Sequence, residues 1–373
     1  MLVYYFLLAW IILAGVLLKF RVGYGDLHII SGRLLYIMVT FIPLTIVMCF
    51  RGVYVGTDTH LIYINEIWPY IASFNSFSDL LNAPDTKDYV YYSAYYFLQL
   101  LSQDDHFLIF CESLIIMIGM AVFLYRTSTN LLLSAIIFFS IFFFWAMNNN
   151  RQAVSLMFIL NSWYFLYKDI ISKKGWLLFI IGAGCHASSL IFLMALISAE
   201  ITKRNISYRK IIFVTSIVSI AISCSALFLI KQFMAGLPPM YQDYLLGNSA
   251  YNFLNGVESS FHILGVVFIF FILAYIFSLH HLDSEKDDMA RAMLPSLIFM
   301  TTFYMVFNGN ELTVRALMSI EMLFLIFIPC VVNRYKEIPR LVGSLIVVVA
   351  FSVRGLYLAE SGVFGVIPYV FFE

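Results

Sequence analysis

Three arginines border short polar segments that interrupt long apolar runs. Arg51 opens the segment Arg-Gly-Val-Tyr-Val-Gly-Thr-Asp, Arg151 closes a run of three asparagines, and Arg315 follows Asn-Gly-Asn-Glu-Leu-Thr-Val. A guanidinium is planar, permanently charged and able to hold phosphate oxygens through two parallel hydrogen bonds. Taken alone, any one of these arginines could instead extend its side chain to place its charge at the membrane interface, without binding a ligand. As a set, Arg51, Arg151 and Arg315 are candidate ligands of a pyrophosphate.

Groups that could accept a proton from an attacking hydroxyl accompany these arginines. The candidates for this catalytic role are His186, Asp58 and Glu311. Two alternatives stay open, because Asp58 could cap the helix that follows it and Glu311 could be a solvated loop charge. Glu112 and Glu321 lie inside apolar runs, where a carboxylate marks a site or pairs with a neighbouring helix.

A cluster of tyrosines precedes the third apolar run. Five of the eight residues from 89 to 96 are tyrosine, and Tyr92, Tyr95 and Tyr96 are candidate sugar contacts. A tyrosine combines an apolar face with a hydroxyl group, which suits a sugar ring. The same residues are also typical of the aromatic belt at a membrane interface.

The composition limits the class of protein that can position these residues. The chain has 373 residues, of which 62% are hydrophobic and 12% are charged, whereas a soluble domain carries about 25% charged residues. This excludes a soluble enzyme, a disordered chain and a nucleic-acid binder. The five cysteines are widely spaced, and neither a metal-ligand spacing nor a phosphate-binding glycine loop is present, so we expect no metal and no cofactor.

Ten apolar runs predict membrane-spanning helices, since a bilayer core requires about 20 apolar residues per helix. We therefore expect an all-α, polytopic integral membrane protein forming a single domain over residues 1–373, with its first span retained. Residues 51–106 and 231–260 are expected to be external loops. The predicted spans are roughly 2–18, 34–50, 107–125, 131–147, 152–167, 211–230, 261–279, 293–307, 316–332 and 341–358.

The distribution of Lys and Arg predicts the orientation of these spans. Basic residues lie on both sides of the apolar stretch 176–198, so both of its ends are expected in the cytoplasm. Its centre, Gly-Ala-Gly-Cys-His-Ala-Ser-Ser, favours a break near His186, with half-helices at about 176–183 and 187–198 and a serine capping the second. The alternative is one ordinary span with a buried histidine. A re-entrant pair puts both termini outside and leaves six basic residues there: Arg51, Lys87, Arg151, Lys231, Arg315 and Arg354.

These motifs together resemble the EpsG family of Wzy-type polysaccharide polymerases. The resemblance rests on Arg51 with Gly56, Thr57, Asp58 and Tyr63, on Arg151-Gln152-Ala153, on Gly184-Cys185-His186-Ala187-Ser188, and on Arg315 before a late span. It covers about residues 1 to 335.

The resemblance implies a reaction at the periplasmic face of a bacterial inner membrane. A glycan would be transferred from undecaprenyl pyrophosphate to a lipid-linked repeat unit, without a nucleotide sugar or a metal. Arg151 and Arg315 would bind the pyrophosphate, Arg51 would assist or hold Asp58, and His186 or Asp58 would activate the acceptor. A chain-length regulator and a flippase are the implied partners, together with membrane lipid and the lipid-linked oligosaccharide.

Other classes of function stay open. A transporter or flippase for the lipid-linked oligosaccharide also suits broken helices and intramembrane polar residues. Its charges should line a path near the membrane centre, whereas the candidates here gather toward one face. A related lipid-linked glycosyltransferase or ligase, and a membrane acyltransferase using His186, are further alternatives.

Overall fold

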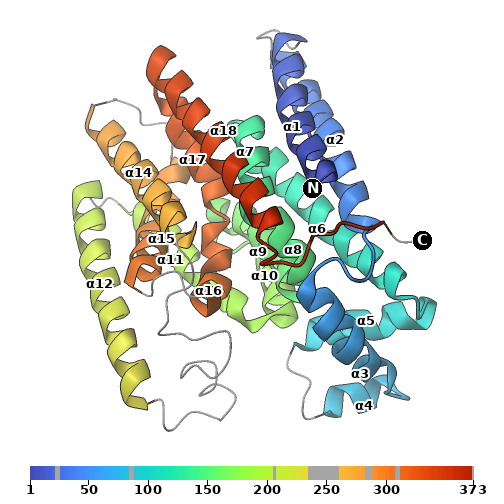
Figure 1. Ribbon diagram of the computed structural model, residues 1–373. Helices are drawn as coiled ribbons and strands as arrows, with labels where there is room; N and C mark the ends of the chain where they lie inside the picture. Colours follow the sequence, from blue (N-terminus) through green and yellow to red (C-terminus); the bar gives the residue numbers. More distant parts are fainter. Residues whose placement is uncertain are drawn as a thin grey trace. The chain divides into compact units, whose positions relative to one another are not determined.

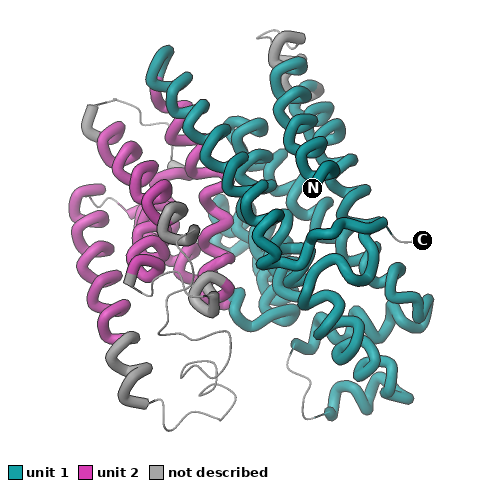
Figure 2. Tube along the Cα trace, in the orientation of Figure 1, with its two compact units in different colours: residues 1–189, 336–373 teal, residues 190–335 magenta. Residues whose placement is uncertain are grey.

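The computed structural model describes residues 1–21, 26–83, 88–204, 207–233, 260–281, 288–306 and 311–371. In this part of the chain the regular secondary structure is helical and no β-strand is formed, which confirms the all-α prediction. The chain divides into two compact units, residues 1–189 with 336–373 and residues 190–335 (Figure 2), and each is described by itself.

Unit 1 contains the N-terminal half of the chain and the last long helix (Figure 1). Its long helices are α1 (Leu2–Arg21), α2 (Asp26–Cys49), α6 (Asp105–Thr127), α9 (Asn150–Lys168), α10 (Lys173–Cys185) and α18 (Glu337–Glu360). A continuous helical run is made by α7 (Leu131–Phe138), the π-helical segment η2 (Phe139–Phe143) and α8 (Phe144–Asn148). Almost every side chain of this run is buried, as expected for a helix that is apolar on all faces.

The predicted external loop 51–106 is itself largely helical. It contains the π-helix η1 (Thr59–Ile67) and the helices α3 (Trp68–Ala72), α4 (Phe77–Asn82) and α5 (Tyr89–Leu101). Figure 1 shows α3, α4 and α5 gathered at one end of unit 1. The second predicted loop, 231–260, lies almost entirely outside the described residues, as does Lys87.

Unit 2 is built around α15 (Asp288–Val306), which packs against α11 (Leu193–Lys203), α12 (Tyr208–Phe233), α14 (Ser260–His281), α16 (Glu311–Glu321) and α17 (Phe324–Arg334). Polar side chains join its helices through backbone carbonyls. The Ser198 hydroxyl donates to the Ala292 carbonyl at 2.6 Å, and the Tyr335 hydroxyl donates to the Ala274 carbonyl at 2.6 Å.

All ten predicted spans fall on helical segments, but their number as membrane spans stays a prediction. Within the described residues, six helices are long and apolar enough to cross a membrane: Gly32–Cys49, Asp105–Thr127, Leu131–Asn148, Tyr208–Ser225, Leu317–Arg334 and Glu337–Glu360. Leu2–Leu18 and Gly265–Leu279 are shorter apolar helices. Helix α9 contributes many buried polar side chains and belongs to neither group. The orientation of the termini likewise stays a prediction.

The predicted break at His186 is confirmed. Helix α10 ends at Cys185, and His186 has extended backbone angles (φ −159°, ψ 118°). The next segment differs from the prediction, since a 3₁₀ turn, η3 (Ala187–Phe192), comes before α11 starts at Leu193. No serine caps that helix, because its N-cap residue is Phe192. Whether the chain turns back at His186 stays a prediction, because α11 belongs to unit 2.

Candidate functional site

The residues that sequence reasoning selected in unit 1 converge on the start of α9. Asn149 interrupts the helix between α8 and α9 (φ −105°, ψ 59°). The Asn148 Oδ1 atom accepts the Asp58 N–H at 2.6 Å. The Asn149 amide, turned so that its oxygen accepts from the Trp145 indole at 3.2 Å, donates to Asp58 Oδ2 at 3.3 Å. Two asparagines therefore hold Asp58, which is buried.

Asn150 links two buried charged side chains. Its Oδ1 atom accepts from Arg51 Nη2 at 3.2 Å, and its Nδ2 atom donates to Glu112 Oε2 at 2.6 Å. The Tyr91 hydroxyl donates to the other Glu112 oxygen at 2.7 Å. Arg51 has no exposed surface, and its Nη1 atom donates to the Met48 carbonyl and the Ser113 hydroxyl at 2.7 Å each. Arg51 is thus placed to fix Asn150 and the start of α9, and it is shielded from any ligand.

The segment that carries Arg51 and Asp58 is held by the C-terminal tail. Gly52 N–H donates to the Val370 carbonyl at 2.7 Å, and Gly56 N–H donates to the Gly365 carbonyl at 2.9 Å. Gly56 has a φ of +102°, and a Cβ atom there would collide with the Met147 carbonyl oxygen. Only glycine fits both the backbone angle and this close approach. Asp58 follows at the N-cap position of η1 but makes no side-chain capping bond, so the structure does not support the helix-cap alternative.

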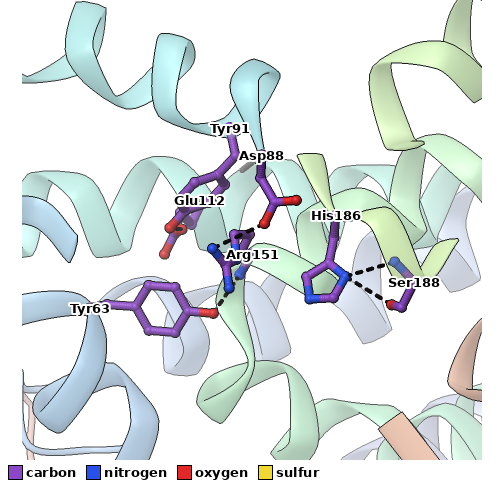
Figure 3. Close-up of polar contacts among 7 residues, drawn as sticks. All are labelled: Tyr63, Asp88, Tyr91, Glu112, Arg151, His186 and Ser188. Atoms are coloured by element: carbon purple, nitrogen blue, oxygen red, sulfur yellow. Dashed lines mark hydrogen bonds and ion pairs between the residues drawn. The ribbon is translucent and has the colours of Figure 1, made fainter. Parts of the chain in front are cut away.

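Arg151 is a partly accessible cation in unit 1. Its Nη1 atom lies 3.0 Å from Asp88 Oδ2, and the two side chains are 24% and 9% exposed. The backbone N–H of Arg151 donates to the Tyr63 hydroxyl at 3.2 Å. Burial raises the pKa of the Tyr63 phenol to about 12, so this hydroxyl stays protonated at neutral pH. Figure 3 shows Arg151 between Asp88 and Tyr63.

The guanidinium of Arg151 keeps hydrogen-bonding capacity. Its Nε atom is buried and has no acceptor among the described residues, although a buried guanidinium N–H needs one. Asp88 fixes the group in place through Nη1, and the side chain keeps 24% of its surface exposed. An anion with several oxygen atoms would bind at this exposed part.

His186 is joined to the residue beside Arg151. Its Nδ1 atom lies 2.8 Å from the Ser188 hydroxyl and 3.2 Å from the Ser188 N–H (Figure 3). The Gln152 Nε2 atom donates to the same hydroxyl at 3.1 Å. This chain of hydrogen bonds therefore connects the predicted catalytic histidine to Gln152, the residue that follows the predicted pyrophosphate ligand Arg151 in α9.

Small residues bring α10 close to its neighbours. The Ser155 hydroxyl of α9 donates to the Gly182 carbonyl at 2.6 Å and lies 2.5 Å from the Ser189 hydroxyl. A Cβ atom at Gly184 would collide with the side chain of Val90. Because Val90 lies two residues after Asp88, the glycine lets the end of α10 approach the start of α5. This packing explains why the small-residue run precedes His186.

The predicted sugar contacts have different environments. Tyr95 is buried and stacks on Trp68 and Tyr91, with ring centroids 5.8 and 4.3 Å apart. Tyr92 is buried in α5. Burial raises the pKa of its phenol, and the positive charge of nearby Arg151 partly offsets this rise. Tyr96 is half-buried and packs against Phe77 and Phe97, 5.7 Å away in each case. Of the three, Tyr92 lies beside the arginine, and Tyr95 contributes to the aromatic core.

Arg315 and Glu311 lie on α16 of unit 2. Arg315 is half-buried, and the side chain of Glu311 lies outside the described residues. Their predicted place beside Arg151 therefore stays a prediction. Arg354, another basic residue predicted outside, instead has a structural role, because its Nη1 atom donates to the Ser140 carbonyl in η2 at 2.7 Å.

Sequence reasoning missed Asp88, which pairs with Arg151, and the roles of Gln152 and Ser188. Asp88 lies next to a tyrosine-rich segment, and no local pattern distinguishes it from the other acids of the loop. Gln152 and Ser188 stood inside the quoted motifs, but their contact depends on the packing of α9 on α10. No group of three or more His, Cys, Asp or Glu side chains that could hold a metal ion occurs in the described ranges.

The helical fold and the site define a membrane protein in which a partly accessible arginine is fixed by buried polar groups. The EpsG family matches residues 34–371, and the chain belongs to that family. This confirms the family predicted from the motifs. EpsG proteins are Wzy-type polymerase-like proteins, which indicates a glycosyltransferase-like polymerase of polysaccharide biosynthesis. No curated protein and no solved structure matches the chain.

Proposed function

We propose that this protein polymerises a polysaccharide by transferring a glycan from undecaprenyl pyrophosphate to a lipid-linked repeat unit. The observation that carries the proposal is the environment of Arg151. This cation is fixed by buried Asp88 at 3.0 Å, and its side chain is partly accessible. A pyrophosphate leaving group needs such a preorganised positive charge, because negative charge develops on it in the transition state.

The proposed step is a direct displacement. The oxygen of an acceptor hydroxyl forms a bond to the anomeric carbon of the donor glycan, while the bond from that carbon to the pyrophosphate oxygen breaks. The electron pair leaves with undecaprenyl pyrophosphate, and the hydroxyl proton passes to a base. The predicted bases are Asp58, His186 and Glu311. The displacement inverts the configuration of the anomeric carbon.

Arg151 and Arg315 are the proposed pyrophosphate ligands. Arg51 serves the site indirectly, because its buried guanidinium bonds to Asn150 next to Arg151. Tyr92 and Tyr96 stay as proposed sugar contacts, and Tyr92 is the stronger candidate because it lies near Arg151. The proposed partners are the lipid-linked oligosaccharide, membrane lipid, a chain-length regulator and a flippase.

We place the reaction at the periplasmic face of the bacterial inner membrane. The support for this side is the distribution of basic residues, since sixteen of the 22 Lys and Arg residues would then face the cytoplasm. The donor is already activated as a pyrophosphate, so the proposed chemistry requires neither a nucleotide sugar nor a metal.

Reconstitution with the lipid-linked repeat unit alone tests the function. The purified protein in vesicles is expected to produce a ladder of glycans, each longer by one repeat unit. A flippase would instead move the repeat unit across the bilayer without making it longer. Transport without chain growth would overturn the polymerase proposal.

A further inference from the structure

The hydrogen bonds around His186 determine which of its ring nitrogens carries the proton. The Nδ1 atom receives the backbone N–H of Ser188 at 3.2 Å. A backbone N–H can only donate, so Nδ1 must be the accepting, unprotonated nitrogen. Figure 3 shows Nδ1 turned toward Ser188, with the other ring nitrogen directed away from it.

The Ser188 hydroxyl supports the same assignment. Its oxygen accepts from Gln152 Nε2 at 3.1 Å, and it lies 2.8 Å from His186 Nδ1. Because the hydroxyl accepts on the Gln152 side, its own proton is directed to Nδ1. The backbone N–H and the hydroxyl of Ser188 thus both donate to Nδ1. A hydrogen atom carried by Nδ1 itself would point at both of these donors. A neutral imidazole with this pattern carries its hydrogen on Nε2.

We infer that His186 is held as the neutral Nε2–H tautomer and serves as a hydrogen-bond donor to the pyrophosphate oxygens of the substrate, with Ser188 and Gln152 as positioning residues. The role of the donor rests on the proposed function, whereas the tautomer does not. A neutral donor beside Arg151 would stabilise the developing charge on the leaving group. In this form Nδ1 already accepts hydrogen bonds and does not serve as the base. A carboxylate must then take the proton from the acceptor hydroxyl. The candidate in unit 1 is the buried Asp58.

Nitrogen-15 NMR of the full-length protein labelled at histidine tests the tautomer independently of activity. The His186 signals are assigned as those lost in His186→Gln, since the chain has 7 histidines. We expect one unprotonated nitrogen at Nδ1 and one protonated nitrogen at Nε2 at neutral pH. In Gln152→Glu the new carboxylate accepts the Ser188 hydroxyl proton, but the Ser188 backbone N–H still donates to Nδ1, so the Nε2–H form should persist. A proton on Nδ1 in the wild type or in Gln152→Glu would overturn the assignment.

Two amide substitutions test the role of the donor in chain growth. The amide of His186→Gln can reach the position of Nε2–H, whereas His186→Asn replaces only the Nδ1 side. Removal of one preorganised donor costs about 10²–10³-fold in rate. We therefore expect that loss for His186→Asn and a rate within about tenfold of the wild type for His186→Gln. A general base would be lost in both variants, at about 10²–10⁴-fold, and equal losses would overturn the donor role.

His106→Gln is the matched control, because His106 is a partly exposed histidine at the start of α6 that pairs with Asp104. It should leave the rate unchanged. If the wild type itself fails to polymerise, the proposed function falls, while the NMR result still decides the tautomer.

Discussion

The Asp88 carboxylate and the Arg151 guanidinium form an ion pair of 3.0 Å between the N-terminal ends of two different helices, α5 and α9. The pair fixes the direction of the Arg151 guanidinium. Truncating one partner of a buried pair leaves the other partner's charge uncompensated. The two residues are therefore expected to act together, and the site should depend on Asp88 as much as on the arginine.

Asp88→Asn should reduce chain growth by about 100-fold, because a misplaced binding group costs roughly 10² in rate. The asparagine keeps the size of the side chain but removes the charge that holds Arg151. The measurement is the initial rate of glycan extension by protein in vesicles. Asp79→Asn, at an exposed acid on α4, is the control and should not change the rate. Equal rates for the two variants would show that chain growth does not depend on the ion pair.

Arg151→Lys should be nearly as damaging as removal of the side chain. Lysine keeps the positive charge but lacks the planar fork that binds two phosphate oxygens and Asp88 together. We expect a loss of about 10²-fold or more in chain growth, the loss typical of one removed transition-state donor. Arg126→Lys, at an exposed arginine in the last turn of α6, should stay near the wild-type rate. Full activity of Arg151→Lys would show that charge alone is sufficient.

Gly56→Ala should destabilise the protein because Gly56 combines a positive φ with close packing. The φ is +102°, and the new Cβ would collide with the Met147 carbonyl. Strained backbone costs about 1–3 kcal/mol, and the collision adds to this, so the thermal midpoint in detergent should fall by several degrees. Gly362→Ala provides the comparison, since it has a φ of +73° with nothing within 4 Å of the Cβ. Its midpoint should fall less, and equal shifts would contradict a role for the collision.

Cysteine labelling should place Lys174 and Lys203 on the same side of the membrane if the chain turns back at His186. Both lysines are exposed, whereas Ser172 caps α10 and is better left intact. The partly accessible Cys111 and the exposed Cys224 are first replaced by serine. A membrane-impermeant thiol reagent should then label Lys174→Cys and Lys203→Cys from the cytoplasmic side. Labelling from opposite sides would show a single crossing.

The positions of the helices could be predicted from the sequence because apolar runs of span length leave the chain few alternatives. The runs 107–125 and 341–358, for example, fall inside α6 and α18. The break at His186 was also visible, since two glycines and two serines weaken a helix. The predicted start of the next α-helix, at about residue 187, was wrong, because a 3₁₀ turn continues to Phe192 before α11 begins.

The candidate site could be predicted only in part. Arg151, Asp58 and His186 stood out because charged or titratable side chains are rare in this sequence. Their actual partners depend on tertiary packing that no local pattern encodes. Asp88 reaches Arg151 because Gly184 permits close approach of Val90, and Arg51 proves to be buried behind Asn150. The same reasoning selects Arg315, whose place beside Arg151 stays a prediction.

The most direct test of the central claim measures the leaving group. Purified protein in vesicles receives only the undecaprenyl-pyrophosphate-linked repeat unit, and both products are quantified over time. We predict one undecaprenyl pyrophosphate released for each new glycosidic bond, with both products lost together in Arg151→Lys. Chain growth that requires a nucleotide sugar, or that releases no undecaprenyl pyrophosphate, would contradict the account.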